Sequence, residues 1–203
     1  MKILCIGRNY VEHAKELNNQ VPTEPVIFSK TDSALLLKNK PFFIPDFAND
    51  FHHEVELVIK INRTGKNIGA QFAHRYYEEV ALGIDFTARD LQAKLKSKGL
   101  PWEKAKAFDG SAVLSKFVNK EQFADIQNIN FRLDKNGETV QKGNSEDMIF
   151  SIAQIIEHVS QYFTLKIGDL IYTGTPAGVG PVAINDRLQG YLEDEKMFDF
   201  LVK

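Results

Sequence analysis

The sequence predicts a β-rich α+β fold that forms a single domain over residues 1–203. Three observations lead to this prediction. Short segments rich in Val, Ile, Leu and Phe follow one another closely, few segments carry the periodicity of an amphipathic helix, and strands and helices do not alternate regularly. No repeat, low-complexity tract or linker-like run divides the sequence into parts.

The strand-like segments are recognised by apolar, β-branched composition and by turn residues at their ends. They lie at residues 2–6, 26–30, 35–39, 42–45, 55–61, 81–87, 116–123 and 128–143. Inside the last segment, Asn136 and Gly137 indicate a tight hairpin turn, because both residue types tolerate positive φ. Residues 168–188 combine a short strand with a Gly- and Pro-rich loop and further strand-like pieces.

Four segments predict short helices, at residues 11–17, 70–81, 87–99 and 151–163. In the third segment Thr87 is the expected N-cap and Gly99 the expected end. The fourth segment has the strongest signals, since Ser151 and Gln154 form a capping box before an apolar face at helical spacing.

Composition and charge exclude several classes of function. The net charge of −2 and the pI of about 6.2 do not favour binding to nucleic acid or to an anionic membrane, and the basic stretch at residues 94–106 fits a solvated helix end. A single cysteine, Cys5, excludes an intramolecular disulfide framework and suits a reducing compartment. No apolar run is long enough to cross a bilayer. Together with the charge, this leads us to expect a cytoplasmic protein without membrane or nucleic-acid partners.

Two glutamates stand two residues apart at the start of the strand-like segment at 55–61: Glu56 lies in the segment and Glu54 just before it. Glu54 and Glu56 therefore point to the same face, where like charges repel. A third carboxylate, Asp85, closes another apolar run, which a neighbouring strand could supply. Three converging carboxylates suit a hard cation such as Mg²⁺ or Mn²⁺. The alternative is a solvated strand face with two surface glutamates, and spacing alone favours it.

A histidine and a glutamate stand three residues apart in the first helical segment. On a helical turn His13 and Glu16 share a face and can form a hydrogen bond, which orients an imidazole as a general base. A surface pair without function has the same spacing.

Two further features concern anionic substrates. Lys106 could offer a positive charge to an anion, or could be one exposed lysine among several. The loop at residues 173–180 lacks the Gly-Lys-Ser/Thr ending of a P-loop, so it does not indicate nucleotide binding. It could present backbone N–H groups and the Thr175 hydroxyl to a carboxylate, or simply connect two strands.

Six motifs, taken in order, resemble the fumarylacetoacetate hydrolase family. They are GRNYVEHAKEL, HHEVELVI, GIDFTARDLQ, KGLPWEKAKAFDGSA, FSIAQII and GDLIYTGTPAGVGP. The resemblance runs from about residue 3 to about residue 190 and is closest to short single-domain members of the acylpyruvase and oxaloacetate-decarboxylase type. It implies a roll of mixed β-sheets like the family's C-terminal domain, a homodimer, and one divalent metal ion per subunit, Mg²⁺ or Mn²⁺.

The resemblance also implies roles for single residues. Glu54, Glu56 and Asp85 match the family's metal ligands. His13 and Glu16 match a dyad that activates water.

By the same resemblance, Lys106 matches an active-site lysine. Arg8, Gln92 and Thr175 match positions that contact the substrate. Lys30 lies where members often carry Lys-Pro and is expected to bind substrate as well, although Thr31 replaces the proline here.

The expected reaction is metal-dependent hydrolysis of the C–C bond of a short acylpyruvate-type 2,4-dioxo acid, through a pyruvate enolate. The same site could instead decarboxylate oxaloacetate, which needs the same enolate but no water. It could also isomerise a hydroxymuconate-type diacid, 2-hydroxyhepta-2,4-diene-1,7-dioate. From another class, a catalytically silent protein could bind the metal and a small 2-oxo acid, but the presence of both His13 and Glu16 argues against that alternative.

Overall fold

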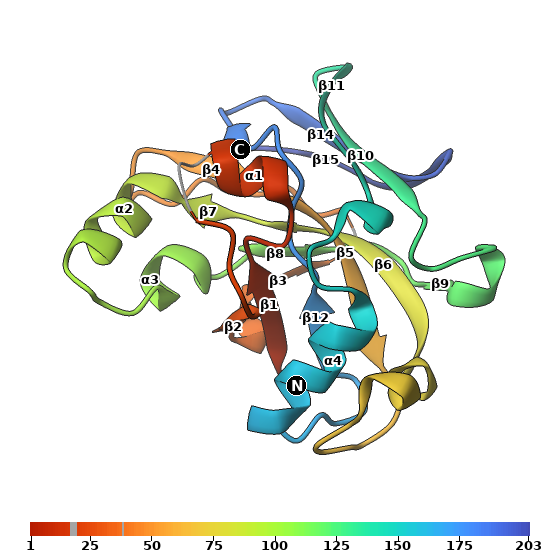
Figure 1. Ribbon diagram of the computed structural model, residues 1–203. Helices are drawn as coiled ribbons and strands as arrows, with labels where there is room; N and C mark the ends of the chain where they lie inside the picture. The colour runs from red at the N-terminus through yellow and green to blue at the C-terminus, as the bar shows by residue number, and fades with distance from the viewer. Residues whose placement is uncertain (17–19, 38) are drawn as a thin grey trace.

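The computed structural model describes residues 1–16, 20–37 and 39–203. Three sheets and a few short helices make up the fold (Figure 1), so the predicted β-rich α+β class is confirmed. In this view α2 and α3 lie together at the left, and the strands β10, β11, β14 and β15 form a separate layer at the upper right.

The largest sheet is mixed and has the strand order β2-β1-β12-β5-β6-β8-β3, with β9 paired to β6. Its strands are β1 (Ile3–Gly7), β2 (Val26–Lys30), β3 (Leu35–Leu37), β5 (Val55–Ile61), β6 (Tyr77–Asp85), β8 (Ala112–Leu114), β9 (Val118–Asn119) and β12 (Leu170–Tyr172). The pairs β1–β12 and β3–β8 are parallel and the other pairs antiparallel. The parallel β1–β12 pair brings the N-terminal segment beside the Gly- and Pro-rich loop that follows β12.

A second, four-stranded sheet is antiparallel throughout, in the order β11-β10-β14-β15. Its strands are β10 (Asn130–Lys135), β11 (Glu138–Asn144), β14 (Arg187–Leu192) and β15 (Glu195–Leu201). The predicted hairpin turn is present between β10 and β11, with Asn136 and Gly137 both at positive φ, 56° and 88°. A small third sheet joins β4 (Phe51–His53), β7 (Thr87–Ala88) and β13 (Gly180–Pro181).

The α-helices are short. They are α1 (Val11–Glu16), α2 (Arg89–Ser97), α3 (Glu103–Lys106) and α4 (Ile152–Tyr162), and short 3₁₀ turns lie at η1 (Asp32–Ala34), η2 (Ala70–Arg75), η3 (Lys120–Gln122) and η4 (Ser145–Asp147). The predicted capping box of α4 is present: Ser151 accepts from the backbone N–H of Gln154, and the Gln154 side chain accepts from the N–H of Ser151. No helix in the described ranges is long and apolar enough to cross a membrane.

Three local predictions were wrong. The helix expected at 70–81 is a 3₁₀ turn that ends at Arg75, because Tyr77 and Val80 pair with β5 and are buried in the core. Thr87 lies in β7 and does not cap α2, which begins after Ala88. The segment at 42–45 is not a strand of a sheet: it forms an isolated parallel bridge at Phe42, and Phe42 and Ile44 donate backbone hydrogen bonds to Leu201 and Lys203 near the C-terminus.

Parts of two predicted elements lie outside the described residues. These are residue 17 of the expected helix at 11–17 and residue 38 of the expected strand at 35–39. The strand expected at 116–123 is present only as β9, and Lys120–Gln122 form a 3₁₀ turn instead. The other predicted strands and helices are present with boundaries shifted by a few residues.

Strand β5 is buried on both faces. Leu57 and Ile59 belong to the larger apolar cluster, and Val58 belongs to the smaller one with Tyr172. Tyr172 also lies over Gly83 of β6, where an added Cβ would come within 2.6 Å of both the Tyr172 ring and the Val113 carbonyl oxygen. This tight packing sets the relative position of β5 and β6, the two strands that carry most of the acidic residues described next.

Candidate active site

The three predicted metal-binding carboxylates lie together. Glu56 is in β5, Glu54 stands in the link before it, and Asp85 ends the neighbouring strand β6. The antiparallel register pairs Val55 with Ile84, and the Asp85 N–H donates to the Glu54 carbonyl oxygen at 2.8 Å. All three side chains are buried, and one carboxylate oxygen from each lies within 4.8 Å of the others. Adjacent strand ends thus create the cluster that was expected from the sequence.

Three cationic side chains neutralise two of these carboxylates. Arg89 Nη2 lies 2.5 Å from Glu54 Oε1, and Lys106 Nζ lies 2.8 Å from both Glu54 Oε2 and Asp85 Oδ2. Lys30 Nζ lies 2.7 Å from Asp85 Oδ1. Glu56 instead accepts one hydrogen bond, from the Gly174 N–H at 2.8 Å. Among the residues that the structure describes, none forms an ion pair with Glu56.

The pKa values of the two glutamates reflect this difference. Burial raises the pKa of Glu54, but the charges of Lys106 and Arg89 outweigh burial and hold that pKa far below its usual range. Burial and the charges of Asp85 and Glu54 raise the pKa of Glu56 well above normal. A divalent cation fits this donor set, since it prefers carboxylate oxygens and would supply the positive charge that Glu56 lacks.

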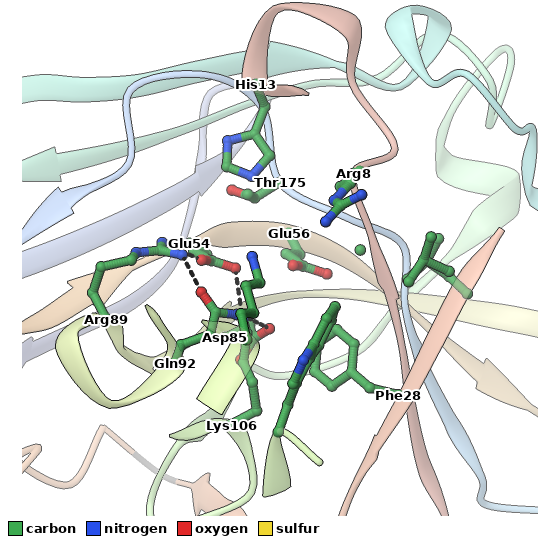
Figure 2. Close-up of a pocket in the computed structure, with 15 residues that line it drawn as sticks. Arg8, His13, Phe28, Glu54, Glu56, Asp85, Arg89, Gln92, Lys106 and Thr175 are labelled. Atoms are coloured by element: carbon green, nitrogen blue, oxygen red, sulfur yellow. Dashed lines mark hydrogen bonds and ion pairs between the residues drawn. The ribbon is translucent and has the colours of Figure 1, made fainter. Parts of the chain in front are cut away.

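Above the carboxylates, α1 carries the predicted dyad. His13 Nδ1 lies 3.3 Å from Glu16 Oε2, and Glu16 also accepts from the Gly178 N–H. Burial lowers the pKa of His13, so the imidazole is neutral at pH 7. With Nδ1–H donating to Glu16, Nε2 is left as a proton acceptor. Figure 2 shows His13 on the far side of Thr175 from the carboxylates, above the pocket.

A single pocket collects most of the predicted site residues. It is lined by Ile6, Gly7, Arg8, His13, Val26, Phe28, Glu54, Glu56, Asp85, Arg89, Gln92, Lys96, Trp102, Lys106 and Thr175. The metal triad, His13, Lys106 and the predicted substrate contacts Arg8, Gln92 and Thr175 are therefore all brought together (Figure 2). Glu16 supports His13 from outside the lining.

Lys30 was expected to contact substrate but does not line this pocket. Its buried ammonium group donates to Ser111 Oγ at 2.9 Å and to the backbone carbonyl of Lys106, and pairs with Asp85. β2 places the lysine behind the carboxylates, where its hydrogen bonds are used inside the protein. In this arrangement Lys30 positions Asp85 and Lys106, and its contact with a substrate stays a prediction.

The sequence analysis missed Arg89, which connects the metal triad to a substrate contact. Arg89 Nη1 donates to Gln92 Oε1 at 2.9 Å while Nη2 pairs with Glu54. The carbonyl end of the Gln92 amide is thereby occupied, and its NH₂ group is left for a ligand. The i, i+3 spacing of the two residues in the helix is a signal that could have indicated this pair.

Gln141 was also missed, and it reaches the site from the four-stranded sheet. Its Oε1 accepts from the Val55 N–H at 3.0 Å and bonds His53 Nδ1 at 2.9 Å, while Nε2 donates to Thr175 Oγ1 at 2.9 Å. Thr175 in turn donates its hydroxyl proton to the Val55 carbonyl at 2.8 Å. The Thr175 hydroxyl is thus held against β5, and its proton is used within the protein. No local sequence pattern indicates this contact, because Gln141 lies 34 residues from Thr175.

Comparisons with known proteins identify the family of the chain. The family model for the fumarylacetoacetate (FAA) hydrolase C-terminal domain matches residues 2–199. The mitochondrial oxaloacetate tautomerase of Mus musculus is 43% identical over 201 residues, covering 99% of this chain and 91% of the relative. Escherichia coli (strain K12) oxaloacetate tautomerase is 43% identical over 188 residues, covering 92% and 86%.

One similar solved structure contains a metal ion. Fumarylpyruvate hydrolase from Pseudomonas aeruginosa, in complex with Mn²⁺ and pyruvate, superposes with a TM-score of 0.93 at 31% identity. The alignment covers 100% of this chain and 90% of that one. These relatives are enzymes, and this chain belongs to the fumarylacetoacetate hydrolase family.

Proposed function

We propose that this protein is a divalent-metal-dependent enzyme that interconverts the keto and enol forms of oxaloacetate. One observation carries the proposal: three buried carboxylates and a neutral histidine with a free ring nitrogen face the same pocket. The relatives at 41–44% identity are named as oxaloacetate tautomerases or as an oxaloacetate decarboxylase, which supports the choice of substrate.

Glu54, Glu56 and Asp85 would hold the cation, for which we propose Mg²⁺ or Mn²⁺. When bound, such a cation supplies a Lewis acid that polarises the 2-oxo group and stabilises the charge of the enolate. The family resemblance supports a homodimer as the working form. The single cysteine suits a reducing compartment such as the cytoplasm, and we include both in the proposal.

His13 acts as the general base in this proposal. Its Nε2 takes a proton from C3 of oxaloacetate, and Glu16 stabilises the imidazolium that results by accepting from Nδ1–H. The imidazolium then gives this proton to the enolate oxygen, which forms the enol and returns His13 to its neutral state. Lys106 contributes positive charge to the site, but its three N–H bonds are used on Glu54, Asp85 and Thr87, so it is not free to donate a proton.

Hydrolysis of a short acylpyruvate is the second candidate function. The His13–Glu16 dyad favours it, because the same base can deprotonate a water molecule. The likeness to a fumarylpyruvate hydrolase at 31% identity supports it as well. Both candidates pass through the enolate of a 2-oxo acid and use the residues named above. They differ in the proton that His13 takes, which comes from C3 of the substrate in tautomerisation and from a water molecule in hydrolysis.

The test compares three substrates: oxaloacetate, acetylpyruvate and a hydroxymuconate-type diacid. Enol absorbance and product formation are followed with Mn²⁺ or Mg²⁺ and after chelation. We expect oxaloacetate to react fastest, chelation to abolish turnover, and Glu56→Gln to lower kcat/KM by about 100-fold or more, as loss of a metal ligand removes several kcal/mol of stabilisation. Glu138→Gln, in an exposed hairpin, is the control. Undiminished turnover in Glu56→Gln would exclude the metal site, and faster hydrolysis of acetylpyruvate would favour the second candidate.

A further inference from the structure

We propose that Lys96, together with Arg8, forms a second carboxylate-binding subsite at the mouth of the pocket, which selects 2-oxo dicarboxylic acids over 2-oxo monocarboxylic acids. The inference rests on the proposed function in that a 2-oxo acid is assumed to occupy the base of the pocket. It adds a residue to which neither the family resemblance nor the relatives' names assign a role.

One face of α2 leads from the buried carboxylates to the mouth of the pocket. Arg89, Gln92 and Lys96 are spaced by three and four residues and so lie on the same side of the helix. All three line the pocket. Arg89 contacts Glu54 and Gln92 is buried, whereas Lys96 is exposed. The helix therefore places Lys96 farther from the metal triad than Gln92, toward solvent.

An aromatic wall holds the lysine over the pocket. Lys96 Nζ lies 5.2 Å from the centroid of the Trp102 ring, and Trp102 packs against Phe28, which lines the same pocket. A cation over the face of an indole ring is attracted by the ring quadrupole. The ammonium group is thus directed along the pocket wall, and its hydrogen-bond donors stay available to a ligand.

Arg8 approaches the same region from the end of β1. Its backbone has φ of 60°, a left-handed conformation that is unfavourable for a residue with a side chain. Figure 2 shows its guanidinium group near Glu56 and facing the pocket. Although the residue as a whole is exposed, partial burial of its ammonium group lowers the pKa of Lys96, and the charge of Arg8 lowers it further, as expected of two cations placed close together.

In the part of the chain that the structure describes, no carboxylate forms an ion pair with Arg8 or Lys96. At the base of the pocket, by contrast, three cations already pair with two of the three carboxylates, Glu54 and Asp85. Arg8 and Lys96 take no part in these ion pairs. A ligand that brings its first carboxylate and its oxo group to the base would bring its second carboxylate to them.

Equilibrium binding tests this subsite separately from catalysis. The probes are 2-oxoglutarate, a dianion, and 2-oxopentanoate, a monoanion with the same number of carbon atoms, each titrated into the Mn²⁺-loaded protein by calorimetry. We expect the wild type to prefer 2-oxoglutarate, and Lys96→Gln to weaken 2-oxoglutarate binding about tenfold while leaving 2-oxopentanoate unchanged. Lys96→Arg keeps the charge and should keep the preference. Lys94→Gln, an exposed lysine of the same helix outside the lining, is the matched control.

Kinetics then connects the subsite with the reaction. In Lys96→Gln we expect the KM for oxaloacetate to rise about tenfold with kcat within about twofold of the wild type, since Lys96 contacts only the unreactive end of the substrate. Equal weakening of both binding probes, an unchanged preference in Lys96→Gln, or no preference in the wild type would each overturn the proposal. If the proposed function were wrong but the subsite correct, the wild type would not turn over oxaloacetate but would still bind 2-oxoglutarate more tightly than 2-oxopentanoate.

Discussion

At the scale of single residues, Gln141 shows how a side chain outside the pocket sets the position of one inside it. The amide satisfies the Val55 N–H, a ring nitrogen of His53 and the Thr175 hydroxyl at the same time. An apolar side chain of similar size would leave these buried groups without partners, and each unpaired buried group costs about 1–3 kcal/mol. The segment before β5 and the loop after β12 thus depend on one residue of the other sheet.

We therefore expect Gln141→Met to lower the free energy of unfolding by about 2–4 kcal/mol. Thr175 would also lose the donor that fixes it, so the KM for the substrate should rise. Urea denaturation measures the first effect and steady-state kinetics the second. Gln71→Met, at an exposed position, provides the control. A loss of stability no larger than that of the control would show that water replaces the amide and that the residue does not position Thr175.

The site residues that the sequence could predict share a property: their spacing within a short stretch of sequence already places their side chains together. Glu54 and Glu56 alternate along a strand, and His13 and Glu16 share a helical turn, so local periodicity placed each pair. The place of Asp85 beside the two glutamates depends on which strands pair, and the sequence does not show this locally. The position of Lys30 behind Asp85 depends on a contact across 55 residues of sequence, from 30 to 85, which no local pattern determines. The family resemblance gave Lys30 a contact with the substrate, which stays a prediction.

At the scale of elements, strands and helices with strong local signals formed as expected, and those without such signals followed tertiary contacts. The capping box of α4 and the Asn136-Gly137 turn are complete in short stretches of sequence, so context could not change them. The segment after Arg75 has helical character, but pairing with β5 buries Tyr77 and Val80, and this gain outweighs helix propensity. Thr87 is drawn into β7, where its hydroxyl accepts from Lys106.

The hairpin of β14 and β15 allows a test of stability against pH. Hydrogen bonds from Arg187 Nε and Nη2, at 2.7 and 2.9 Å, lower the pKa of Asp199 to about 2 from its usual value of 3.8. Between these pH values the unfolded chain binds a proton that the folded chain does not, so acid favours unfolding. The contribution of Asp199 to stability is therefore present above pH 3.8 and is lost as the pH falls through 2.

Asp199→Asn should consequently unfold at a lower urea concentration than the wild type at pH 7, and the difference should shrink as the pH falls from about 4 to about 2. Midpoints of urea denaturation at several pH values measure this difference. Asp194→Asn removes an exposed carboxylate from the same hairpin and should stay close to the wild type throughout. A difference for Asp199→Asn that does not depend on pH would contradict the role given to the ion pair.

At the scale of the whole molecule, the site joins parts of the chain that are far apart in sequence. Glu54 and Glu56 come from one side of the β5–β6 pair, Asp85 from the other, and the loop after β12 closes the base through the Gly174 N–H. Unfolding separates these ligands, so a cation that binds all three binds the folded chain far better than the unfolded one. Burial, together with the nearby charges of Asp85 and Glu54, raises the pKa of Glu56, so the folded chain disfavours a third negative charge at this place.

Divalent cations should therefore raise the stability of the entire fold. At a free Mn²⁺ concentration of about 100 times Kd, mass action adds about 2.7 kcal/mol, which corresponds to a rise in Tm of roughly 5–10 °C for a chain of this length. In Glu56→Gln the rise should disappear. The metal-free variant should be at least as stable as the metal-free wild type, because the substitution removes a buried charge that Asp85 and Glu54 repel. Calorimetry with and without Mn²⁺ measures both effects, and an equal rise in the two proteins would mean that the cation binds elsewhere.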